Sequence, residues 1–164
     1  MRTATAISAL TAMTLSVGAG SLHAQSATIQ ATATVLSAIT VTGTNLAFGN
    51  VTPGVNKTVA ITDAGAGQFI VTKAAATSVA LTFTLPTNLT FGVNNLPIGT
   101  WTGGWNNTAN SAAGATGFTP SAAATTVPSG GASLWVWVGG TVSPAGAQAA
   151  GSYSGNVTMQ VAYL

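Results

Sequence analysis

The chain has 164 residues, of which 47% are hydrophobic and only 2% are charged, and it contains no cysteine. Nucleic-acid binding requires several phosphates to be neutralised by Lys or Arg, and three basic side chains exclude it. The hydrophobic fraction is high enough to form a core, which excludes a disordered chain.

Residues 1–24 have the pattern of a secretory signal peptide. Met1 and Arg2 form a basic start, an uncharged apolar run follows, and Ala24 ends the segment with a small residue. No basic flank follows the apolar run, so we expect cleavage after Ala24 rather than a membrane anchor. A packed N-terminal helix is the alternative. The mature chain is then exported and has no membrane span.

Beyond the predicted signal peptide, Lys57, Lys73 and Asp63 are the only charged side chains, and no His, Cys, Glu or Arg occurs. Acid–base catalysis, paired carboxylates and metal sites need those residue types. We therefore expect no enzyme activity, no cofactor and no metal. The two lysines are expected to be solvated at strand ends, and Asp63 to bond the backbone of a Gly-rich turn.

The rest of the chain shows period-two alternation interrupted by Gly, Pro and Asn clusters, which is typical of short β-strands. We expect strands within residues 38–42, 58–62, 68–72, 78–85, 89–91, 133–142 and 151–164. Residues 92–131 are rich in Gly, Asn, Ala, Ser and Thr, and predict long loops with one or two weak strands. About seven or eight short strands indicate an all-β, immunoglobulin-like antiparallel β-sandwich. A sheet closed on itself is the alternative.

The first alternating stretch, Thr28–Thr42, is too long for one strand of a sandwich. It would extend about 50 Å at about 3.3 Å per residue, whereas strands usually have about 5–6 residues. We divide it into an N-terminal arm, 25–36, and the sandwich domain, 37–164. The arm could add to an open sheet edge of another molecule or fold back as an edge strand of its own domain. The side chains that would enter the sheet are Ile29, Ala31, Ala33 and Val35.

The chain ends inside a predicted strand. The sequence Gly-Ser-Tyr-Ser-Gly at 151–155 is followed by alternation to the penultimate Tyr163. This C-terminus resembles that of chaperone–usher pilins, especially the spore coat protein U-like group. Phe48-Gly49, Pro53-Gly54 and the stretch 138–142 are similar to a related family of uncharacterised bacterial secreted domains. The chain lacks the cysteine pair common among such pilins.

The resemblance implies an incomplete immunoglobulin-like sandwich that is completed by donor-strand exchange. The partners would be other copies in a homopolymer, together with a periplasmic chaperone and an outer-membrane usher, and the protein would pass through the periplasm to a fimbrium on the cell surface. The implied donor strand carries Ile29, Ala31, Ala33 and Val35. The implied acceptor groove and chaperone-binding edge carry Val157, Met159, Val161 and Tyr163.

Trp135 and Trp137 share one side of the predicted strand 133–142, opposite the apolar side chains expected to face the core. As an exposed pair they would form a contact surface for a protein or a sugar. The other interpretation is that the Gly-rich loop covers them, with packing against Trp101 and Trp105.

Two functions therefore remain open from the residues alone. The first is a structural subunit of a fimbria, pilus or surface coat that assembles through its arm, which suits a chain of near-zero net charge. The alternative is a self-complete, monomeric secreted binding module that contacts carbohydrate through exposed tryptophans.

Overall fold

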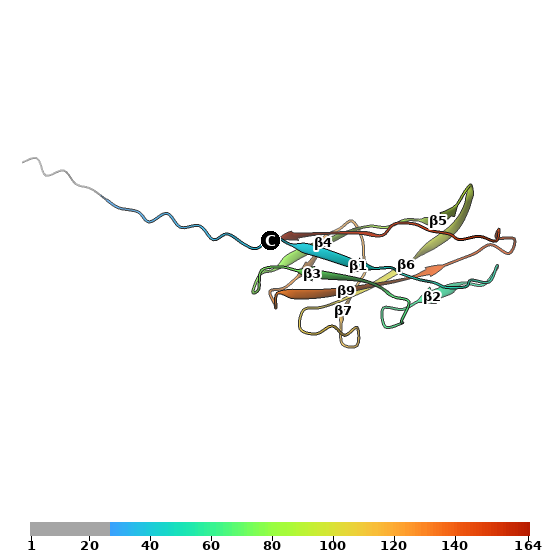
Figure 1. The fold of residues 1–164 in the computed structure, drawn as a ribbon, viewed down its shortest axis with the longest axis horizontal. Coiled ribbons are helices and arrows are strands. Elements are labelled where there is room, and N and C mark those ends of the chain that lie inside the picture. Colours follow the sequence, from blue (N-terminus) through green and yellow to red (C-terminus); the bar gives the residue numbers. More distant parts are fainter. Residues whose placement is uncertain (1–26) are drawn as a thin grey trace, which may run out of the picture. The chain divides into compact units, whose positions relative to one another are not determined.

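The computed structural model describes residues 27–164, so the predicted signal peptide, 1–24, lies outside the described residues, as do Gln25 and Ser26 of the predicted arm. The described residues form strands and no helix, which confirms the predicted all-β class (Figure 1). The strands are β1 (Thr40–Thr44), β2 (Lys57–Val59), β3 (Gly67–Thr72), β4 (Val79–Thr84), β5 (Asn88–Phe91), β6 (Asn94–Asn106), β7 (Thr116–Phe118), β8 (Thr125–Val127), β9 (Ser133–Val142) and β10 (Thr158–Tyr163).

The larger sheet has seven strands, all joined by antiparallel pairs. Its main order is β1-β3-β9-β6-β5, with β2 pairing β9 beyond the end of β3, and β7 pairing β6. The long apolar strand β9 lies at its centre, between β3 and β6. Strand β1 pairs only with β3 among the described strands, so it forms an edge of the sheet.

The smaller sheet has three strands in the order β10-β4-β8. Its two outer strands are therefore edges within the described part of the chain, and β10 is one of them. The chain passes from β4 in this sheet to β5 in the larger one, and Thr90 of β5 bridges to Ser154 ahead of β10. The two sheets are joined at this corner.

The main core lies between the two sheets. Buried side chains alternate along β4, as the predicted period-two pattern requires. In β9, Leu134, Val136 and Val138 face the core with the same period, and residues 136–140 are buried on both faces. The smaller sheet closes over this core with β8 and β10. The cluster consists of Val71, Val79, Leu81, Phe83, Val127, Leu134, Val136, Val138 and Met159. A second, smaller cluster comprises Leu96, Ile98 and Val142. The predicted antiparallel β-sandwich is confirmed.

The prediction for residues 92–131 was wrong in one respect. This region contains β6, a 13-residue strand, which pairs with β9, β5 and β7. Its alternation is broken because the register with β9 shifts between Gly99 and Thr102. A bulge of this kind moves the side chains that follow it to the other parity, and the periodic pattern is lost from the sequence.

Glycines in β6 leave room for covering side chains. A methyl group at Gly103 would lie 2.6 Å from Phe118 Cζ and 2.9 Å from Pro120 Cγ, and one at Gly104 would lie 2.6 Å from Ile61 Cδ1. Both glycines are buried. The glycine content that indicated a loop therefore marks places where other segments pack closely on a strand.

The described chain divides into two compact units, residues up to Thr34 and Val35–Leu164. Taken by itself, the described part of the first unit, 27–34, contains no strand, and its side chains are exposed. The boundary falls close to the predicted division between the arm and the sandwich. In the described residues, no helix is both long and apolar enough to cross a membrane.

Candidate functional site

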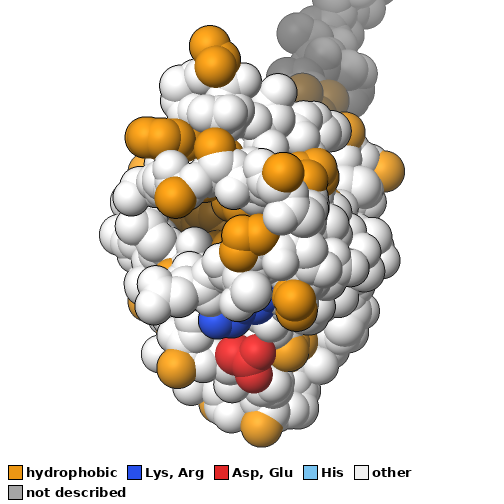
Figure 2. Space-filling model, turned by 90° about the vertical axis from the view of Figure 1, so that its right-hand side faces the viewer, with side chains coloured by type: hydrophobic (Ala, Val, Ile, Leu, Met, Phe, Trp, Pro, Cys, Tyr) orange, Lys and Arg blue, Asp and Glu red, His pale blue; other side chains and the backbone are white. Residues whose placement is uncertain are grey.

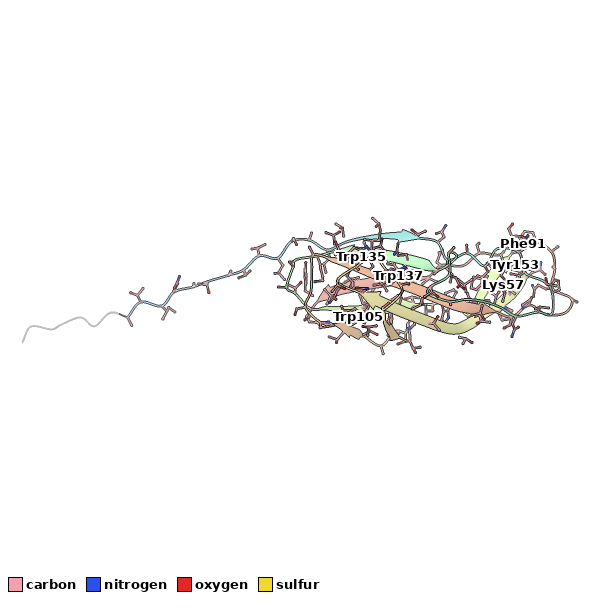
Figure 3. All side chains as sticks on the ribbon, turned by 90° about the horizontal axis from the view of Figure 1, so that it is seen from below. Lys57, Phe91, Trp105, Trp135, Trp137 and Tyr153 are labelled. Carbon is pink, nitrogen blue, oxygen red and sulfur yellow. The ribbon has the colours of Figure 1, made fainter. Side chains whose placement is uncertain are left out.

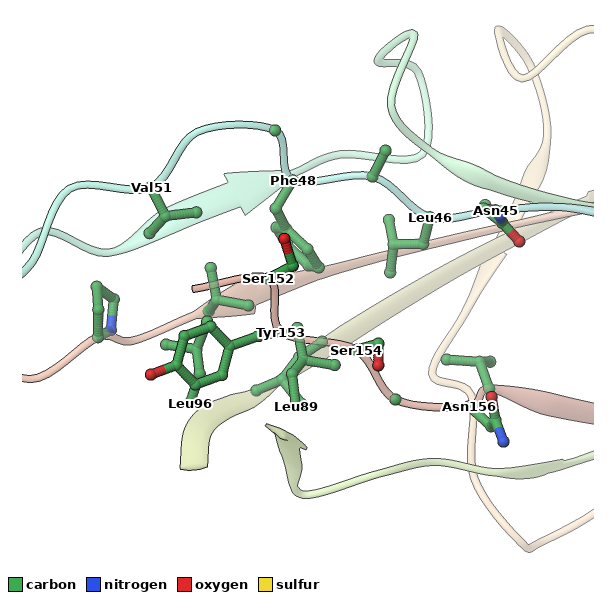
Figure 4. A pocket seen from close by; sticks show the side chains of 18 of the residues that line it. Asn45, Leu46, Phe48, Val51, Leu89, Leu96, Ser152, Tyr153, Ser154 and Asn156 are labelled. Carbon is green, nitrogen blue, oxygen red and sulfur yellow. The ribbon is translucent and has the colours of Figure 1, made fainter. Parts of the chain in front are cut away.

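An open groove of about 990 Å³ runs between two segments that are far apart in sequence. One wall is formed by residues 43–51 and 53, which continue from β1. The other is formed by residues 148–157, which lead into β10. Figure 4 shows Leu46 and Phe48 pointing from the first wall toward the second, where Tyr153 and its serine neighbours lie.

Both walls carry few backbone hydrogen bonds. Across residues 45–51 the described chain makes one backbone-to-backbone bond, from the Ala47 N–H to the Gly65 carbonyl (2.8 Å). Across 149–157 it makes the reciprocal pair between Ser154 and Thr90 (3.1 and 2.8 Å). Unpaired strand edges of this kind present donors and acceptors to an additional strand.

The floor of the groove is the protein core. Leu96, Ile98 and Val142 of the smaller cluster line it, as do Phe69, Trp101 and Val138 at the border of the main one. Phe48, Val51, Leu89 and Tyr153 pack around the smaller cluster and also line the groove. A molecule that enters the groove from outside therefore contacts the apolar core between the two sheets.

Polar side chains lie along the groove, and none of the described residues lining it is charged. Asn45, Ser152, Ser154 and Asn156 provide amide and hydroxyl groups (Figure 4). A neutral occupant with apolar side chains and a hydrogen-bonding backbone fits such a lining. A phosphate, a carboxylate or a metal ion finds no charged partner there.

Beyond Gly43 and Val157, where the lining of the groove stops, lies the part of the domain in which β1 begins and β10 finishes. The Tyr163 hydroxyl donates to the Ser37 carbonyl (2.8 Å) and accepts from the Ala74 N–H (2.7 Å). Leu164 N–H is bonded to the Ser78 carbonyl (3.3 Å). We call this part of the domain, residues 35–37, 73–78 and 163–164, the Tyr163 end.

The opposite end of the groove is formed by three loops, 52–56, 91–95 and 143–149, which we call the groove end. Gly54 N–H bonds the Ala145 carbonyl (3.1 Å), and Gln148 Nε2 bonds the Asn95 carbonyl (3.1 Å). Pro53, Pro144 and Gln148 line the groove, which therefore reaches this end. Figure 2, which looks onto it, shows a hollow with hydrophobic side chains inside.

The predicted acceptor residues lie close to the groove, but only Val157 lines it. Met159 is buried in the main core, and Val161 and Tyr163 are half-buried against it. They share the inward side of β10, as the alternation predicted. The lining residues that sequence reasoning missed are Leu46, Phe48, Val51, Leu89, Leu96 and Tyr153. Tyr153 could have been found from the sequence, because it is the one large side chain among the small residues of Gly-Ser-Tyr-Ser-Gly at 151–155.

The predicted donor residues Ile29, Ala31, Ala33 and Val35 are all exposed, and Ile29 and Val35 are 91% and 93% accessible. No strand described in 27–164 pairs with the outer edge of β10. The edge beside Tyr163 is thus open within the described residues.

The predicted tryptophan contact surface is wrong for Trp137, which is 7% exposed, while Trp135 is half-buried. Trp137 is paired with Gln68 of β3 and Gly104 of β6. The loop after β6 crosses this face, because Gln68 Nε2 bonds Asn110 Oδ1 (2.7 Å). The loop 107–115 therefore covers the face, as the other interpretation held, although Gly114 is its only glycine.

The suggested packing against Trp105 is also wrong. Trp105 is paired with Val136, a core residue, and lies on the opposite face of the sheet from Trp137. Trp101 packs against both core clusters. The reason is the register of β6 against β9, which assigns each tryptophan to a face and cannot be obtained from composition.

The three charged residues in the described part of the chain differ in exposure and in hydrogen-bond partners. Lys57 is exposed at the start of β2, as predicted, and its ammonium donates to the Asn50 carbonyl (3.0 Å). Asp63 accepts the Ala60 N–H (2.8 Å) in its turn, also as predicted. Lys73 was expected to be solvated but is 2% exposed, because the turn after β3 places the carbonyls of Thr77 (2.8 Å) and Ala74 (3.4 Å) around its ammonium.

Within residues 27–164, no group of three or more His, Cys, Asp or Glu side chains could hold a metal ion. No curated protein and no solved structure matches the chain. Residues 39–163, which include both walls of the groove and all ten strands, match the model of a family described as a domain of unknown function, DUF4402. The chain belongs to the DUF4402 family.

Proposed function

We propose that the mature chain is a structural subunit of a bacterial fimbria, pilus or surface coat, and that copies join by donor-strand exchange. The N-terminal arm of one copy, 25–36, would fill the groove of the next. The observation that carries this proposal is the groove, which opens the core between the segment that continues from β1 and the segment that leads into β10, both with few backbone hydrogen bonds.

A β-strand is the ligand that such a groove suits best. In strand addition, the backbone completes a ladder while alternate side chains fill apolar pockets. The walls supply unpaired backbone groups, and the floor supplies apolar surface from both core clusters. Since no described lining residue is charged, the occupant should be neutral and apolar on one side.

The arm has this composition. Ile29, Ala31, Ala33 and Val35 alternate with Gln30, Thr32 and Thr34, and residues 25–36 carry no charge. The stretch from Ile29 to Val35 extends over about 20 Å as a strand. An arm left in water would keep Ile29 and Val35 exposed, and inserting them into a groove stabilises the complex by about 1.5–3 kcal/mol for each fully buried side chain.

The exposed apolar groove would also require partner proteins during export. A subunit with an open groove exposes its core until an arm arrives, and exposed apolar grooves favour aggregation. A periplasmic chaperone that covers the groove, and an outer-membrane usher that receives the subunit, would meet this need. These partners are part of the proposal, as is export to the cell surface.

The alternative of a carbohydrate-binding module has less support. Trp137 is buried, and Trp101 and Trp105 pack against the core. A stacking platform for sugars needs an accessible ring face. Among the described tryptophans, Trp135 alone remains as half-buried surface with no role in the core clusters.

The decisive experiment deletes Gln25–Leu36 behind an intact signal peptide. We expect the variant to form no polymers and to remain monomeric or chaperone-bound. A synthetic peptide of residues 25–36 should bind it and raise its melting temperature. Electron microscopy and peptide titration provide the two readouts, and polymers of unchanged length from the deletion variant would refute the proposal.

The alternation of the arm provides a matched control. Ile29→Asp with Val35→Asp places charges on the side that enters the groove and should abolish polymers. Gln30→Asp with Thr34→Asp adds the same charges to the other side and should leave polymers intact. Equal effects of the two pairs would show that charge alone, rather than strand insertion, causes the loss.

A further inference from the structure

We propose that consecutive copies also contact each other end to end: the groove end of one copy packs against the Tyr163 end of the next, through apolar side chains that are not inserted into the groove. The occupant of each end is a second copy of this chain. This inference rests on the proposed function and adds a second interface to it.

The first observation is where exposed large apolar side chains lie. In the described sandwich, Val35, Leu36 and Leu164 belong to the Tyr163 end and are 93%, 43% and 72% exposed. The only such side chain outside the two ends of the sandwich is Val41 on β1, at 41%.

The groove end carries the other exposed set. Val55, Phe91 and Val93 are 57%, 43% and 96% exposed. Phe91 is held in place by Tyr153, with ring centroids 5.8 Å apart, and Figure 3 shows these two rings together at this end of the domain. Val93 stands in the β5–β6 turn next to Gly92, whose φ is +57°.

The second observation concerns where an inserted arm must leave the groove. Toward the Tyr163 end, the lining stops at Gly43 and Val157, and beyond it the hydrogen bond between Tyr163 and Ser37 ties the end of β10 to the segment before β1. At the groove end, the hollow opens outward (Figure 2). An arm inserted along the groove therefore leaves it at the groove end, with Val35 as its last inserted residue.

The third observation is the length of the tether. Ser37 follows Val35 by two residues, which span at most about 7 Å. In the donor copy Ser37 is bonded to Tyr163, so the whole Tyr163 end must follow it. Leu36 and Leu164 of the donor copy are then brought against Val55, Phe91 and Val93 of the acceptor copy.

Charge does not oppose this contact. No charged side chain among the described residues belongs to the exposed surface of the Tyr163 end, since Lys73 there is buried. Lys57 is exposed at the groove end, beside Phe91 and Tyr153 (Figure 3), and it meets no charged side chain of like sign across the contact. Two different surfaces that meet head to tail form an open chain unless the rotation between copies closes a ring, and here the two surfaces lie at opposite ends of the domain, which favours an open chain. The expected assembly is a linear filament with two contacts at each junction, the arm in the groove and the apolar ends.

Cross-linking tests the contact directly, because the chain has no cysteine of its own. Filaments carrying Val93→Cys with Leu164→Cys are treated with a bis-maleimide whose arm spans about 10 Å. We expect a ladder of covalent multimers after denaturing electrophoresis. The matched control, Ala113→Cys with Leu164→Cys, has its first cysteine in the exposed loop over the outer face of the larger sheet, and should give no ladder.

A charge at the contact provides a second measurement. Val93→Asp should weaken subunit association about tenfold, which corresponds to one or two lost apolar side-chain contacts, and Ala113→Asp should not. Binding of the 25–36 peptide to the arm-deleted form of each variant should be unchanged, because residue 93 does not line the groove.

The readouts separate the two proposals. Normal filaments and peptide binding, with no ladder and no effect of Val93→Asp, would overturn the end-to-end contact and leave strand exchange standing. Absence of peptide binding in the arm-deleted parent would overturn strand exchange, and the end-to-end contact with it. A ladder in the Val93 pair alone supports both.

Discussion

Lys73 and Tyr163 organise the Tyr163 end, each through two hydrogen bonds to backbone groups. Tyr163 connects the Ser37 carbonyl to the Ala74 N–H, and Lys73 binds two carbonyls of the adjoining turn. In the described residues, no buried side-chain nitrogen or oxygen lacks a partner. The alternation placed Tyr163 on the inward side of its strand, but nothing in it indicated which backbone groups the hydroxyl would meet.

Replacing Lys73 tests the importance of this turn. Lys73→Ala leaves the Thr77 carbonyl without its buried donor and removes the packed methylene chain, whereas the Ala74 carbonyl keeps its bond from the Thr77 hydroxyl (2.6 Å). We expect the free energy of unfolding to fall by about 1–3 kcal/mol, measured by urea denaturation. Lys57→Ala is the matched control, because its ammonium is exposed, and it should change the stability by less than about 0.5 kcal/mol. Equal effects would mean that burial of Lys73 does not matter.

At the scale of elements, apolar alternation predicted strands where the side chains themselves form the core. Strand β9 begins and ends where the sequence indicated, at 133 and 142. Strand β6 was missed because its stability comes from what other segments place on it. Phe118, Pro120 and Ile61 fill the space above its glycines, and these contacts are not visible in a window of local sequence.

A methyl group added to β6 tests this explanation. Gly103→Ala would bring Cβ within 2.7 Å of two Phe118 ring atoms, and we expect it to destabilise the fold by about 1–3 kcal/mol through overpacking. Gly99→Ala on the same strand meets no atom within 4 Å and should be nearly neutral. Thermal denaturation of the two variants compares them directly. Equal stability would indicate that Phe118 moves aside without cost.

For the whole molecule, the scarcity of ionisable groups affects its behaviour in solution. A pH dependence of stability requires that the folded and unfolded states bind different numbers of protons. The residues that follow the predicted signal peptide include one acidic side chain, two lysines and no histidine. We therefore expect the free energy of unfolding to vary by less than about 1 kcal/mol between pH 5 and 9, measured by denaturant titration at several pH values. A steep loss of stability within that range would contradict this.

The sequence by itself determined the all-β fold class, because side chains that alternate with a period of two share one face in an extended strand. It also determined which side of β10 faces inward and the scarcity of ionisable groups, with one acidic side chain and no histidine after the predicted signal peptide. Only the tertiary structure decided where the groove lies, which face each tryptophan occupies, and that Lys73 is buried. The physical reason is that these features depend on strand register and on contacts between segments distant in sequence. Residues 43–51 and 148–157 form one site only because β1 and β10 are edges of different sheets that face each other.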